Sequence, residues 1–476
     1  MPLPDINPGL WVLVADWLIR IAALFWIPMR THSAAARTWL LLVGFVPLAG
    51  LPIYLLFGHP WLSAQRRQRQ VQASQSIREQ QRAFAALRWT PGDADDSGAR
   101  DLARLTERVG DFMPTTGNRV ALIDDYDAWL RALIDDIDAA RHEVHLLYYL
   151  MFDDAVGRAV ADALQRAAAR GVRCRLLLDA MGGKPALWAF TRRLRSAGVD
   201  VRAILARGFG WRRSARLDLR NHRKIAVIDG RIGHVGSQNL AAPDFVAGFP
   251  NREVVARVEG PAVLQLAALF ASDWYFETNE ILAMDTVHVD ASAGTVRAQV
   301  LPSGPAYTFE NARSIVIASI QRARRRITLA TPYFVPDEAT LAALCIAALS
   351  GVEVQLILSR SSNQRVTAWA QASHYDELLQ AGVRIALYRP RFLHAKHLTV
   401  DDDIALVGSI NLDIRSFALN AEAGLLCYDR DVAARLREIE ADYLMESDAV
   451  DATAWRARPA WRRSIEGIAR LADSFL

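Results

Sequence analysis

Two apolar stretches lie near the amino terminus of the chain. Residues 38–57 contain no charged side chain over a length that lets an α-helix cross the hydrocarbon layer of a membrane. This pattern predicts one transmembrane helix, because membrane helices tolerate prolines such as Pro47 and Pro52. Residues 9–29 are also apolar but include one acidic and one basic residue, so this segment either crosses the membrane as half of a hairpin or lies in its interface.

The segments that follow set the expected orientation of the chain. We assign residues 1–61 to a membrane anchor and residues 62–114, which are rich in Gln, Arg and Ala, to a polar helical connector with a flexible break near Pro91. No Lys or Arg precedes the first apolar run, which argues against a cleaved signal peptide. Three arginines directly follow the second run and two lie in the loop before it, so the positive-inside rule predicts that the rest of the chain faces the cytoplasm.

The remaining chain contains an internal duplication, in which strand-like apolar runs alternate with helical runs. The first copy has its strand-like runs within residues 142–154, 170–183, 197–205 and 220–239. The second copy repeats them in the same order within residues 325–338, 350–360, 381–388 and 392–411. This alternation predicts an α/β fold of two similar lobes, residues 115–290 and 291–450, with mixed, largely parallel sheets flanked by helices.

Each copy ends in the same set of chemically active residues. An H-x-K-x4-D motif is formed by His222, Lys224 and Asp229 in the first copy and by His394, Lys396 and Asp401 in the second. A Gly-Ser-x-Asn segment follows each motif at the same distance and supplies Ser237 and Asn239 in the first copy, and Ser409 and Asn411 in the second. One chance match is on the order of one in a million, so two matches with identical spacing are a strong signal.

The motif residues suit attack on a phosphodiester. Side chains at positions i and i+2 of a strand face the same way, so His222 should point with Lys224, and the second pair likewise. Two ammonium groups offset the charge of a phosphodiester without a metal, and the nearby Ser and Asn side chains are able to donate to the same oxygens. One imidazole can attack phosphorus while the other protonates the leaving alcohol and then deprotonates the incoming one. The spacing does not decide which histidine has which role.

Carboxylates near the motifs complete the candidate site. A histidine that reacts needs one tautomer, usually held by a carboxylate, and Glu253 and Glu422 lie at similar places downstream of the two motifs. We expect them to orient the histidines, with a purely structural carboxylate as the alternative. We expect Asp229 and Asp401, at strand ends, to hold the motif loops by hydrogen bonds more than to transfer protons. His397 lies on the opposite strand face from the motif histidine and receives no role.

Composition narrows the setting further. The chain is 52% apolar and 23% charged, which is typical of a folded, core-forming protein. A net charge of +4 gives no global attraction to polyanions. The three cysteines lack C-x-x-C spacing and lie in apolar runs, so we expect buried free thiols, with neither a disulfide framework nor a zinc site.

Two basic stretches are candidates for contact with anionic lipid. Residues 207–224 carry seven cationic and two aromatic side chains and lead into the first motif, which suits an anionic phospholipid surface. A solvated charged loop and a nucleic-acid backbone site are the alternatives. Residues 451–476 form a basic amphipathic tail with Trp455 and Trp461, which is either an interfacial helix or an ordinary packed terminal helix.

At these residues the chain resembles the phospholipase D superfamily and, within it, the bacterial cardiolipin synthases. The resemblance covers nearly the whole chain and includes YLLFGHP at 54–60, TPYFVPDE at 331–338 and LHAKHLTVDDDIALVGSINLDIRSFALNAE at 393–422. It implies two α/β lobes with the active site between them, a phosphatidyl-histidine intermediate, and no metal or nucleotide cofactor. By analogy, His222 is the nucleophile and His394 is the acid and base.

The reaction implied by this resemblance joins two phosphatidylglycerol molecules into cardiolipin and releases glycerol. It implies a bacterial inner-membrane protein whose partners are anionic phospholipids and not nucleic acid. Two departures bear on substrate preference and membrane docking. Asn363 stands where such synthases tend to carry Asp, and the chain ends in RLADSFL where they usually end in a Ser-Pro-Leu-Leu type sequence.

Several alternative functions share these motifs. A phospholipase D would use water as acceptor, and acceptor choice depends on pocket shape and water exclusion. Transfer to another lipid alcohol keeps the same chemistry. A nucleic-acid phosphodiesterase gains nothing from the apolar amino-terminal segments, and a non-enzymatic scaffold does not require two intact motifs. The sequence leaves oligomeric state and acyl-chain preference open.

Overall fold

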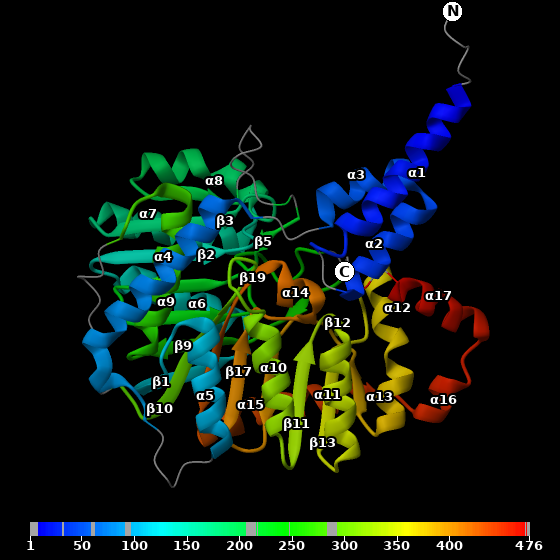
Figure 1. Ribbon diagram of the computed structural model, residues 1–476. Helices are drawn as coiled ribbons and strands as arrows, with labels where there is room; N and C mark the ends of the chain where they lie inside the picture. The colour runs from blue at the N-terminus through cyan, green and yellow to red at the C-terminus, as the bar shows by residue number, and fades with distance from the viewer. Residues whose placement is uncertain are drawn as a thin grey trace, which may run out of the picture.

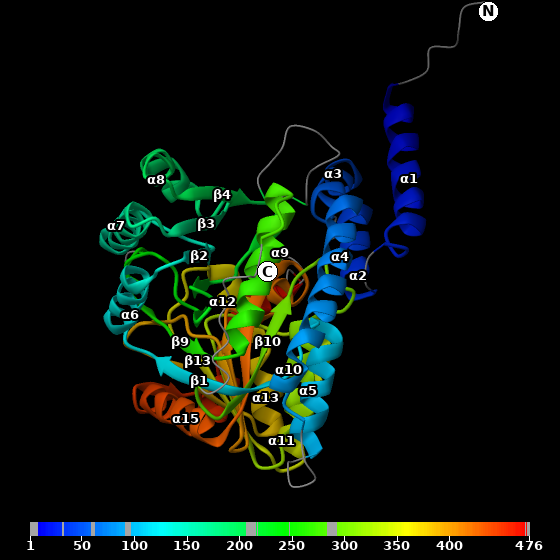
Figure 2. The same cartoon turned by 90° about the vertical axis from the view of Figure 1, so that its left-hand side faces the viewer.

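The computed structural model describes residues 8–30, 33–58, 62–90, 97–205, 216, 218–246, 248–282, 293–471 and 473. Two repeated α/β units share one continuous sheet, with helices packed on it (Figures 1 and 2). The hydrophobic core spans both units, since one buried cluster contains Leu147 and Phe270 from the first unit and Val300 and Leu425 from the second.

The first unit contributes seven strands of the main sheet and four helices. The strands are β1 (Thr115–Ile123), β2 (Glu143–Tyr148), β3 (Arg173–Asp179), β4 (Asp200–Ile204), β6 (Ile225–Ile228), β7 (Ile232–Gly236) and β9 (Val255–Glu259). The helices are α6 (Tyr126–Ala139), α7 (Ala155–Ala169), α8 (Lys184–Ser196) and α9 (Ala262–Thr278). Helix α7 begins where the Asp154 carboxylate accepts a hydrogen bond from Gly157 N, an N-cap that ends the loop after β2.

The second unit repeats this arrangement. Its strands are β10 (Val296–Ser303), β11 (Arg326–Thr331), β13 (Glu353–Ser359), β14 (Arg384–Tyr388), β16 (His397–Val400), β17 (Ile404–Gly408), β19 (Asn420–Tyr428) and β20 (Ser447–Ala449). Its helices are α10 (Asn311–Arg322), α11 (Glu338–Leu349), α12 (Arg365–Ser373), α13 (Tyr375–Ala381), α14 (Ile414–Ala418) and α15 (Arg430–Met445). Five two-residue strands complete the fold: β5 (Arg220–Asn221), β8 (Asn251–Arg252), β12 (Phe334–Val335), β15 (Phe392–Leu393) and β18 (Leu412–Asp413).

The sheet runs in the order β20-β14-β13-β11-β16-β17-β19-β10-β1-β9-β7-β6-β2-β3-β4. Along this path, parallel pairing is confined to β2–β3–β4 and β11–β13–β14, so the prediction of largely parallel sheets is wrong. Parallel neighbours need a long crossover, which the helices provide early in each unit. The later strands β6–β7 and β16–β17 are joined by short turns, which force antiparallel pairing.

The antiparallel pair of β1 and β10 joins the two units at the centre of the sheet. An α/β fold with two repeated units agrees with the sequence analysis. The lobe boundaries at residues 115–290 and 291–450 stay a prediction.

The amino-terminal segment differs from its prediction. Residues 38–57 do not form one helix: α2 (Ser33–Phe45) ends before Val46, and α3 (Pro47–Phe57) begins with Pro47 as its first residue. Val46 has non-helical φ/ψ of −135° and 69°, as expected because a residue before proline is pushed out of the α region. Within the described part of the chain, no helix is at once long enough and apolar enough to cross a membrane.

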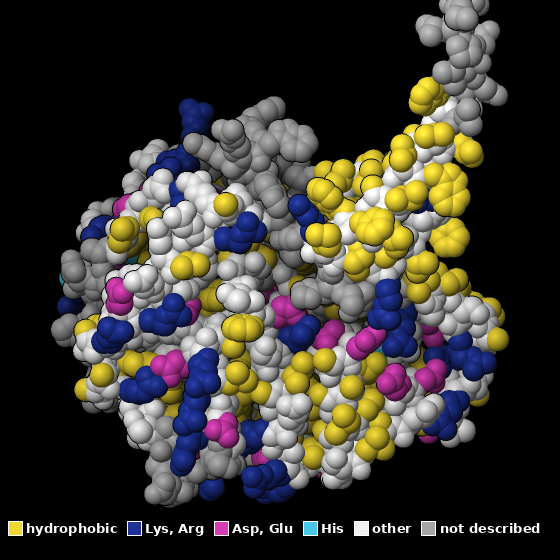
Figure 3. All heavy atoms as spheres, viewed as in Figure 1, with side chains coloured by type: hydrophobic (Ala, Val, Ile, Leu, Met, Phe, Trp, Pro, Cys, Tyr) yellow, Lys and Arg dark blue, Asp and Glu magenta, His cyan; other side chains and the backbone are white. Residues whose placement is uncertain are grey.

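The three amino-terminal helices form a small apolar unit. Helix α1 (Pro8–Trp26) packs with α2 and α3 around Ile27, Trp39 and Val43. Within α1, Asp16 and Arg20 pair at 2.8 Å across one helical turn. Figure 3 shows large apolar side chains over α1 to α3.

The connector and the carboxyl-terminal tail are helical. Helix α4 (Ala64–Gln81), the 3₁₀ helix η1 (Arg82–Leu87) and α5 (Ser97–Gly110) form the connector, and the expected break near Pro91 lies outside the described residues. The tail forms α16 (Ala452–Arg456) and α17 (Ala460–Arg470), of which α17 packs on α12. The three cysteines are buried and free, as predicted.

Candidate active site

Both H-x-K motifs open onto one cavity of about 300 Å³ between the two units. His222 and His394 line it together with Asn239 and Asn411 from the Gly-Ser-x-Asn segments. The sequence predicted that these residues would meet, and the structure places them around one space.

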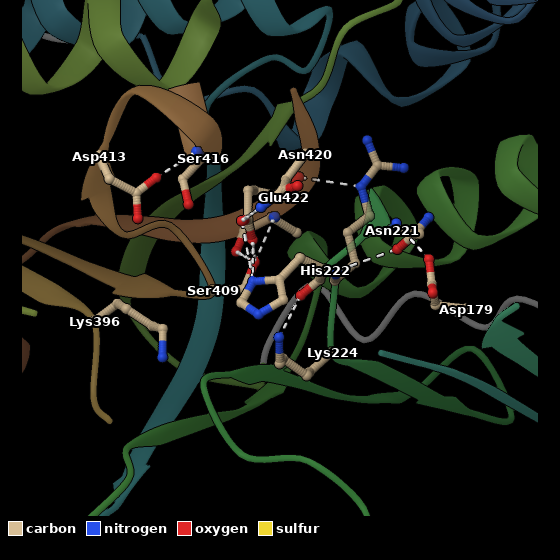
Figure 4. A network of polar contacts seen from close by, with 12 residues as sticks. Asp179, Asn221, His222, Lys224, Lys396, Ser409, Asp413, Ser416, Asn420 and Glu422 are labelled. Atoms are coloured by element: carbon tan, nitrogen blue, oxygen red, sulfur yellow. Dashed lines mark hydrogen bonds and ion pairs between the residues drawn. The ribbon is translucent and has the colours of Figure 1, made fainter. Parts of the chain in front are cut away.

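His222 is held by a carboxylate from the other unit. Its Nδ1 lies 3.0 Å from both oxygens of Glu422, which is fully buried on β19. The backbone explains the approach: β5 pairs with the start of β19, and His222 N donates to Ala421 O at 2.8 Å. Figure 4 shows the His222 ring beneath Glu422 and Ser409.

His394 is held in the reciprocal way. Its Nδ1 lies 2.7 Å from Glu253 Oε1, and Glu253 follows the short strand β8 of the first unit. Strand β15 pairs with β8, and His394 N donates to Arg252 O at 2.9 Å. The expected His-orienting glutamates are therefore present, but each serves the histidine of the opposite unit.

These contacts fix the tautomers. A carboxylate can only accept, so each imidazole donates from Nδ1 and keeps its Nε2 lone pair for chemistry. Burial alone would raise the pKa of Glu253, but the charge and hydrogen bond of His394 bring it down to about 2. Burial lowers the pKa of His394 to about 4 against the opposing effect of Glu253. At neutral pH these pKa values favour an ionised Glu253 beside a neutral His394.

The two lysines lie beside the histidines. Lys224 Nζ donates to His222 O and Lys396 Nζ donates to His394 O, each at 2.5 Å. Figure 4 shows both lysines close to the His222 ring, although they come from different units. Burial lowers the pKa of Lys224 to about 7 and that of Lys396 to about 8, so an anion entering the cavity would restore their charge.

The motif aspartates do not reach the cavity. Asp229 accepts hydrogen bonds from the backbone N–H groups of Arg141, His142 and Glu143, which lead into β2. Asp401 accepts in the same way from the three residues that lead into β11. These contacts agree with the expectation that the two aspartates hold the motif loops, and their place among the catalytic candidates stays a prediction.

The serines and asparagines of the Gly-Ser-x-Asn segments have different roles. Ser409 Oγ donates to Glu422 Oε2 at 2.5 Å, and Ser237 Oγ donates to Val254 O beside Glu253. Both serines are fully buried beside the glutamates and do not line the cavity, so the expectation that they bind substrate oxygens stays a prediction. Asn239 accepts from Leu150 N through Oδ1, which leaves its amide N–H groups to serve as donors at the cavity wall.

The basic run before the first motif is only partly described. Residues 206–215 and 217, with Arg207, Arg212 and Arg213, lie outside the described residues. Arg223 is buried, pairs with Asp273 at 2.6 Å and donates to Glu422 O, so it ties the units together and does not face lipid. Asn363 lines the cavity and accepts from Tyr333 Oη at 2.7 Å.

Among the cavity residues, Tyr149, Asp413 and Arg415 received no role from the sequence, and Arg220 was predicted only as part of the basic stretch of residues 207–224. Burial raises the pKa of Asp413 to about 6, with the nearby Glu422 adding to the rise. None of the four belongs to the H-x-K-x4-D or Gly-Ser-x-Asn pattern. The signal that could have found them is their position: Arg220, Asp413 and Arg415 lie within four residues of a predicted site residue, and Tyr149 lies in the first strand-like run of the first copy, residues 142–154.

The sequence comparisons agree with this geometry. A family model described as "Cardiolipin synthase, PLD-like domain" matches residues 133–274 and 316–442. Cardiolipin synthase A of Serratia proteamaculans (strain 568) is 34% identical, over 96% of this chain and 95% of that protein. The protein of the same name from Yersinia pseudotuberculosis serotype O:1b (strain IP 31758) is 33% identical over the same shares.

A solved structure shares the fold. Phosphatidylserine synthase of Haemophilus influenzae Rd KW20 aligns with a TM-score of 0.60 at 13% sequence identity. The alignment covers 80% of this chain and 100% of that chain. At this level of identity the likeness shows the α/β fold alone.

Proposed function

The chain belongs to the bacterial cardiolipin synthases, which are phosphatidyltransferases of the phospholipase D superfamily, and we propose that it joins two phosphatidylglycerol molecules into cardiolipin and glycerol. The observation that carries this proposal is the convergence of His222 and His394, each with its own glutamate and lysine, on one cavity. Phosphodiester exchange needs two opposed imidazoles, and this geometry provides them.

The first step forms a phosphatidyl-histidine. His222 Nε2 attacks the phosphorus of the donor lipid as the bond from phosphorus to the glycerol oxygen breaks. His394 carries a proton in the substrate complex, because the bound anion raises its pKa, and gives that proton to the leaving glycerol. Glu422 stabilises the cationic imidazole that forms on His222.

The second step is the reverse with a new alcohol. Neutral His394 takes the proton from a hydroxyl of the second phosphatidylglycerol, and that oxygen attacks phosphorus. The phosphorus–nitrogen bond breaks, cardiolipin leaves and His222 is regenerated. Lys224, Lys396 and the amide N–H groups of Asn239 offset the charge that grows on the phosphoryl oxygens in both steps.

We also propose that the amino-terminal helices contact the bilayer. Large apolar side chains are exposed on α1, α2 and α3, among them Trp17, Leu18, Phe45 and Leu55 (Figure 3). A surface of this kind is expected to be covered, and the substrates are lipids. Sedimentation with phosphatidylglycerol vesicles tests this: Leu18→Asp should weaken binding, and unchanged binding would contradict the proposal.

A bacterial inner membrane with the two units on its cytoplasmic side is the setting that we propose. The arginines at the start of α4, directly after the apolar helices, support this orientation. Protease accessibility of the two units in inside-out and right-side-out vesicles tests it, since cleavage only from the periplasmic face would contradict the proposal.

The function is tested with detergent-solubilised protein and phosphatidylglycerol alone, with cardiolipin, glycerol and phosphatidic acid measured together. Cardiolipin with an equal amount of glycerol is the expected result, and phosphatidic acid as the main product would make the protein a hydrolase. His222→Ala and His394→Ala should each abolish turnover. His142→Ala, an exposed histidine outside the cavity, is the matched control and should retain activity.

A further inference from the structure

The two H-x-K motifs are nearly identical, yet the substrates of the proposed reaction are not used alike. One phosphatidylglycerol presents its phosphorus, and the other presents a hydroxyl while carrying a phosphodiester that does not react. A cavity that joins them therefore needs a second place for an anion. Side chains that break the symmetry of the two units are the candidates.

Two arginines in the cavity break this symmetry. Arg220 lies two residues before His222, where the second unit has Phe392 before His394. Arg415 lies four residues after Asn411, where the first unit has Pro243. Neither arginine has a counterpart at the equivalent position of the other unit, whereas the histidine and lysine of the motif are present in both units.

The two arginines lie close to each other. Arg415 Nη2 donates to Asp218 O at 2.5 Å, and Arg220 Nη1 donates to Leu219 O at 2.7 Å, so both are held by neighbouring peptide groups. Strand β5, which carries Arg220, pairs with β19 directly after α14, which carries Arg415. The arginine side chains are partly exposed to the cavity, and their backbone contacts hold them in place.

The charges on this wall favour a bound anion. Asp218 is shared between Arg216, at 2.5 Å, and Arg415, at 3.4 Å. The Asp413 carboxylate also lies within electrostatic range of Arg415, while it accepts a hydrogen bond from Ser416 N at 2.6 Å. Of the described charged side chains that line this side of the cavity, Arg220 and Arg415 are cationic and Asp413 is acidic, so cationic groups outnumber carboxylates there and favour a bound phosphodiester.

Tyr149 separates this wall from the reacting centre. Its ring lies 4.9 Å from the His222 ring, with Lys224 Nζ 5.4 Å from its centre. Burial raises the pKa of the Tyr149 phenol, and Arg220 and Arg415 act against that rise, so both cations are near its hydroxyl. The arginine wall is thus next to the His–Lys centre but distinct from it.

We propose that Arg220 and Arg415 form a second phosphate subsite, which holds the unreacting phosphodiester of the acceptor phosphatidylglycerol. Guanidinium groups suit this ligand because their planar donors match phosphate oxygens. The subsite would make a lipid acceptor preferable to free glycerol or water, which have no phosphate to bind. This inference rests on the proposed transfer reaction and assigns the acceptor within it.

The test compares two acceptors, phosphatidylglycerol and free glycerol, which both react through a glycerol hydroxyl but of which only the first carries a phosphodiester. The enzyme receives phosphatidylglycerol with isotope-labelled free glycerol, and the rates of cardiolipin formation and of label entry into phosphatidylglycerol are measured together. Arg220→Gln and Arg415→Gln should lower cardiolipin formation at least about tenfold relative to glycerol exchange, since a lost charge-assisted pair is worth about one factor of ten or more. Arg415→Lys keeps the positive charge, so its ratio of cardiolipin formation to glycerol exchange should fall less than that of Arg415→Gln.

Arg365→Gln is the matched control, because Arg365 is exposed next to the cavity residue Gln364 and does not line the cavity. The ratio of cardiolipin formation to glycerol exchange in Arg365→Gln should equal that of the unchanged enzyme. The proposed subsite would be overturned if the ratio of cardiolipin formation to glycerol exchange stayed unchanged in both Arg220→Gln and Arg415→Gln, including the case in which both rates fall equally. Absence of both products in the unchanged enzyme would instead overturn the proposed function, and the glycerol exchange rate of each variant reports that its fold is intact.

Discussion

At the scale of single residues, each reacting histidine is paired with a glutamate from the other half of the chain. A buried ion pair contributes little net stability, but removal of one partner leaves the other unpaired in a dry environment. Ser409 Oγ donates to the Glu422 carboxylate, and the Arg223 side chain of the opposite unit donates to the Glu422 backbone carbonyl, which together keep the carboxylate aimed at His222. A substitution that keeps a hydrogen-bond acceptor but removes the charge, such as glutamate to glutamine, should therefore affect the rate more than folding.

Glu253→Gln and Glu422→Gln test this expectation. Glutamine keeps the shape and an acceptor oxygen but loses the charge that stabilises an imidazolium, so kcat should fall by about 10²–10⁴-fold. Glu440→Gln is the matched control, because Glu440 is also buried beside a histidine, 3.5 Å from His397 Nδ1, but lies away from the cavity. Near-normal kcat in either cavity variant would show that the pairs are only structural.

Titration of the two motif lysines should make kcat/KM depend on pH. Burial lowers the pKa of Lys224 to about 7 in the free enzyme, so its charge is present below that pH and is lost as the pH rises through it. We expect kcat/KM to fall above about pH 7. In Lys224→Arg the arginine cannot lose its proton. The alkaline fall of kcat/KM should then follow Lys396, which has a pKa of about 8. An alkaline limb that stays in place in Lys224→Arg would contradict this assignment.

The sequence predicted that the two motif histidines would meet at one site, because the motif spacing alone identifies them. It could not predict which glutamate serves which histidine, since that depends on how β5 meets β19 and β8 meets β15 across the molecule. The same limit explains the serines: Ser409 follows a strand and has a donor group, but its burial against Glu422 depends on the pairing of β17 with β19.

At the scale of elements, the motif aspartates determine where strands begin. Asp229 and Asp401 both have positive φ, 50° and 46°, a conformation that aspartate tolerates better than most residues. Each carboxylate then caps the backbone N–H groups at the start of the neighbouring strand, β2 or β11. The third named residue of the motif, the aspartate, thus holds the start of a neighbouring strand in place.

Asp229→Ala and Asp401→Ala should therefore destabilise the fold by about 1–3 kcal/mol, because backbone donors at the strand start lose a charged acceptor. Thermal or denaturant unfolding measures this, and activity at low temperature should remain substantial. Asp402→Ala is the control, since Asp402 is a neighbouring exposed aspartate that pairs with Arg325 and Arg326 at the surface, and it should change stability little. A stable Asp401→Ala protein without activity would instead favour a catalytic role.

Element predictions failed where one residue decides between two arrangements. The apolar pattern of residues 38–57 is continuous, but Pro47 removes a backbone donor and constrains Val46, so two helices form. The strand–helix alternation predicted parallel strands, but hydrophobic runs do not reveal that the turns after β6 and β16 are too short for a crossover.

At the scale of the whole molecule, the site exists only where the two units meet. The backbone of each motif histidine pairs with the strand segment that carries the opposite glutamate, and β1 and β10 join the units in one sheet. The duplicated sequence predicted two units and one shared site. The continuous sheet and the exchange of glutamates follow from contacts between distant segments, which local patterns do not encode.

This arrangement predicts the outcome of mixing two inactive variants. Since β5–β19 and β8–β15 pair within one chain, a complete site needs His222 and His394 of the same molecule. Purified His222→Ala and His394→Ala proteins, mixed in detergent and also co-expressed, should remain as inactive in cardiolipin formation as either variant alone. Recovered activity in the co-expressed sample would mean that units are exchanged between chains, because only then could one intact histidine from each variant face the same phosphorus.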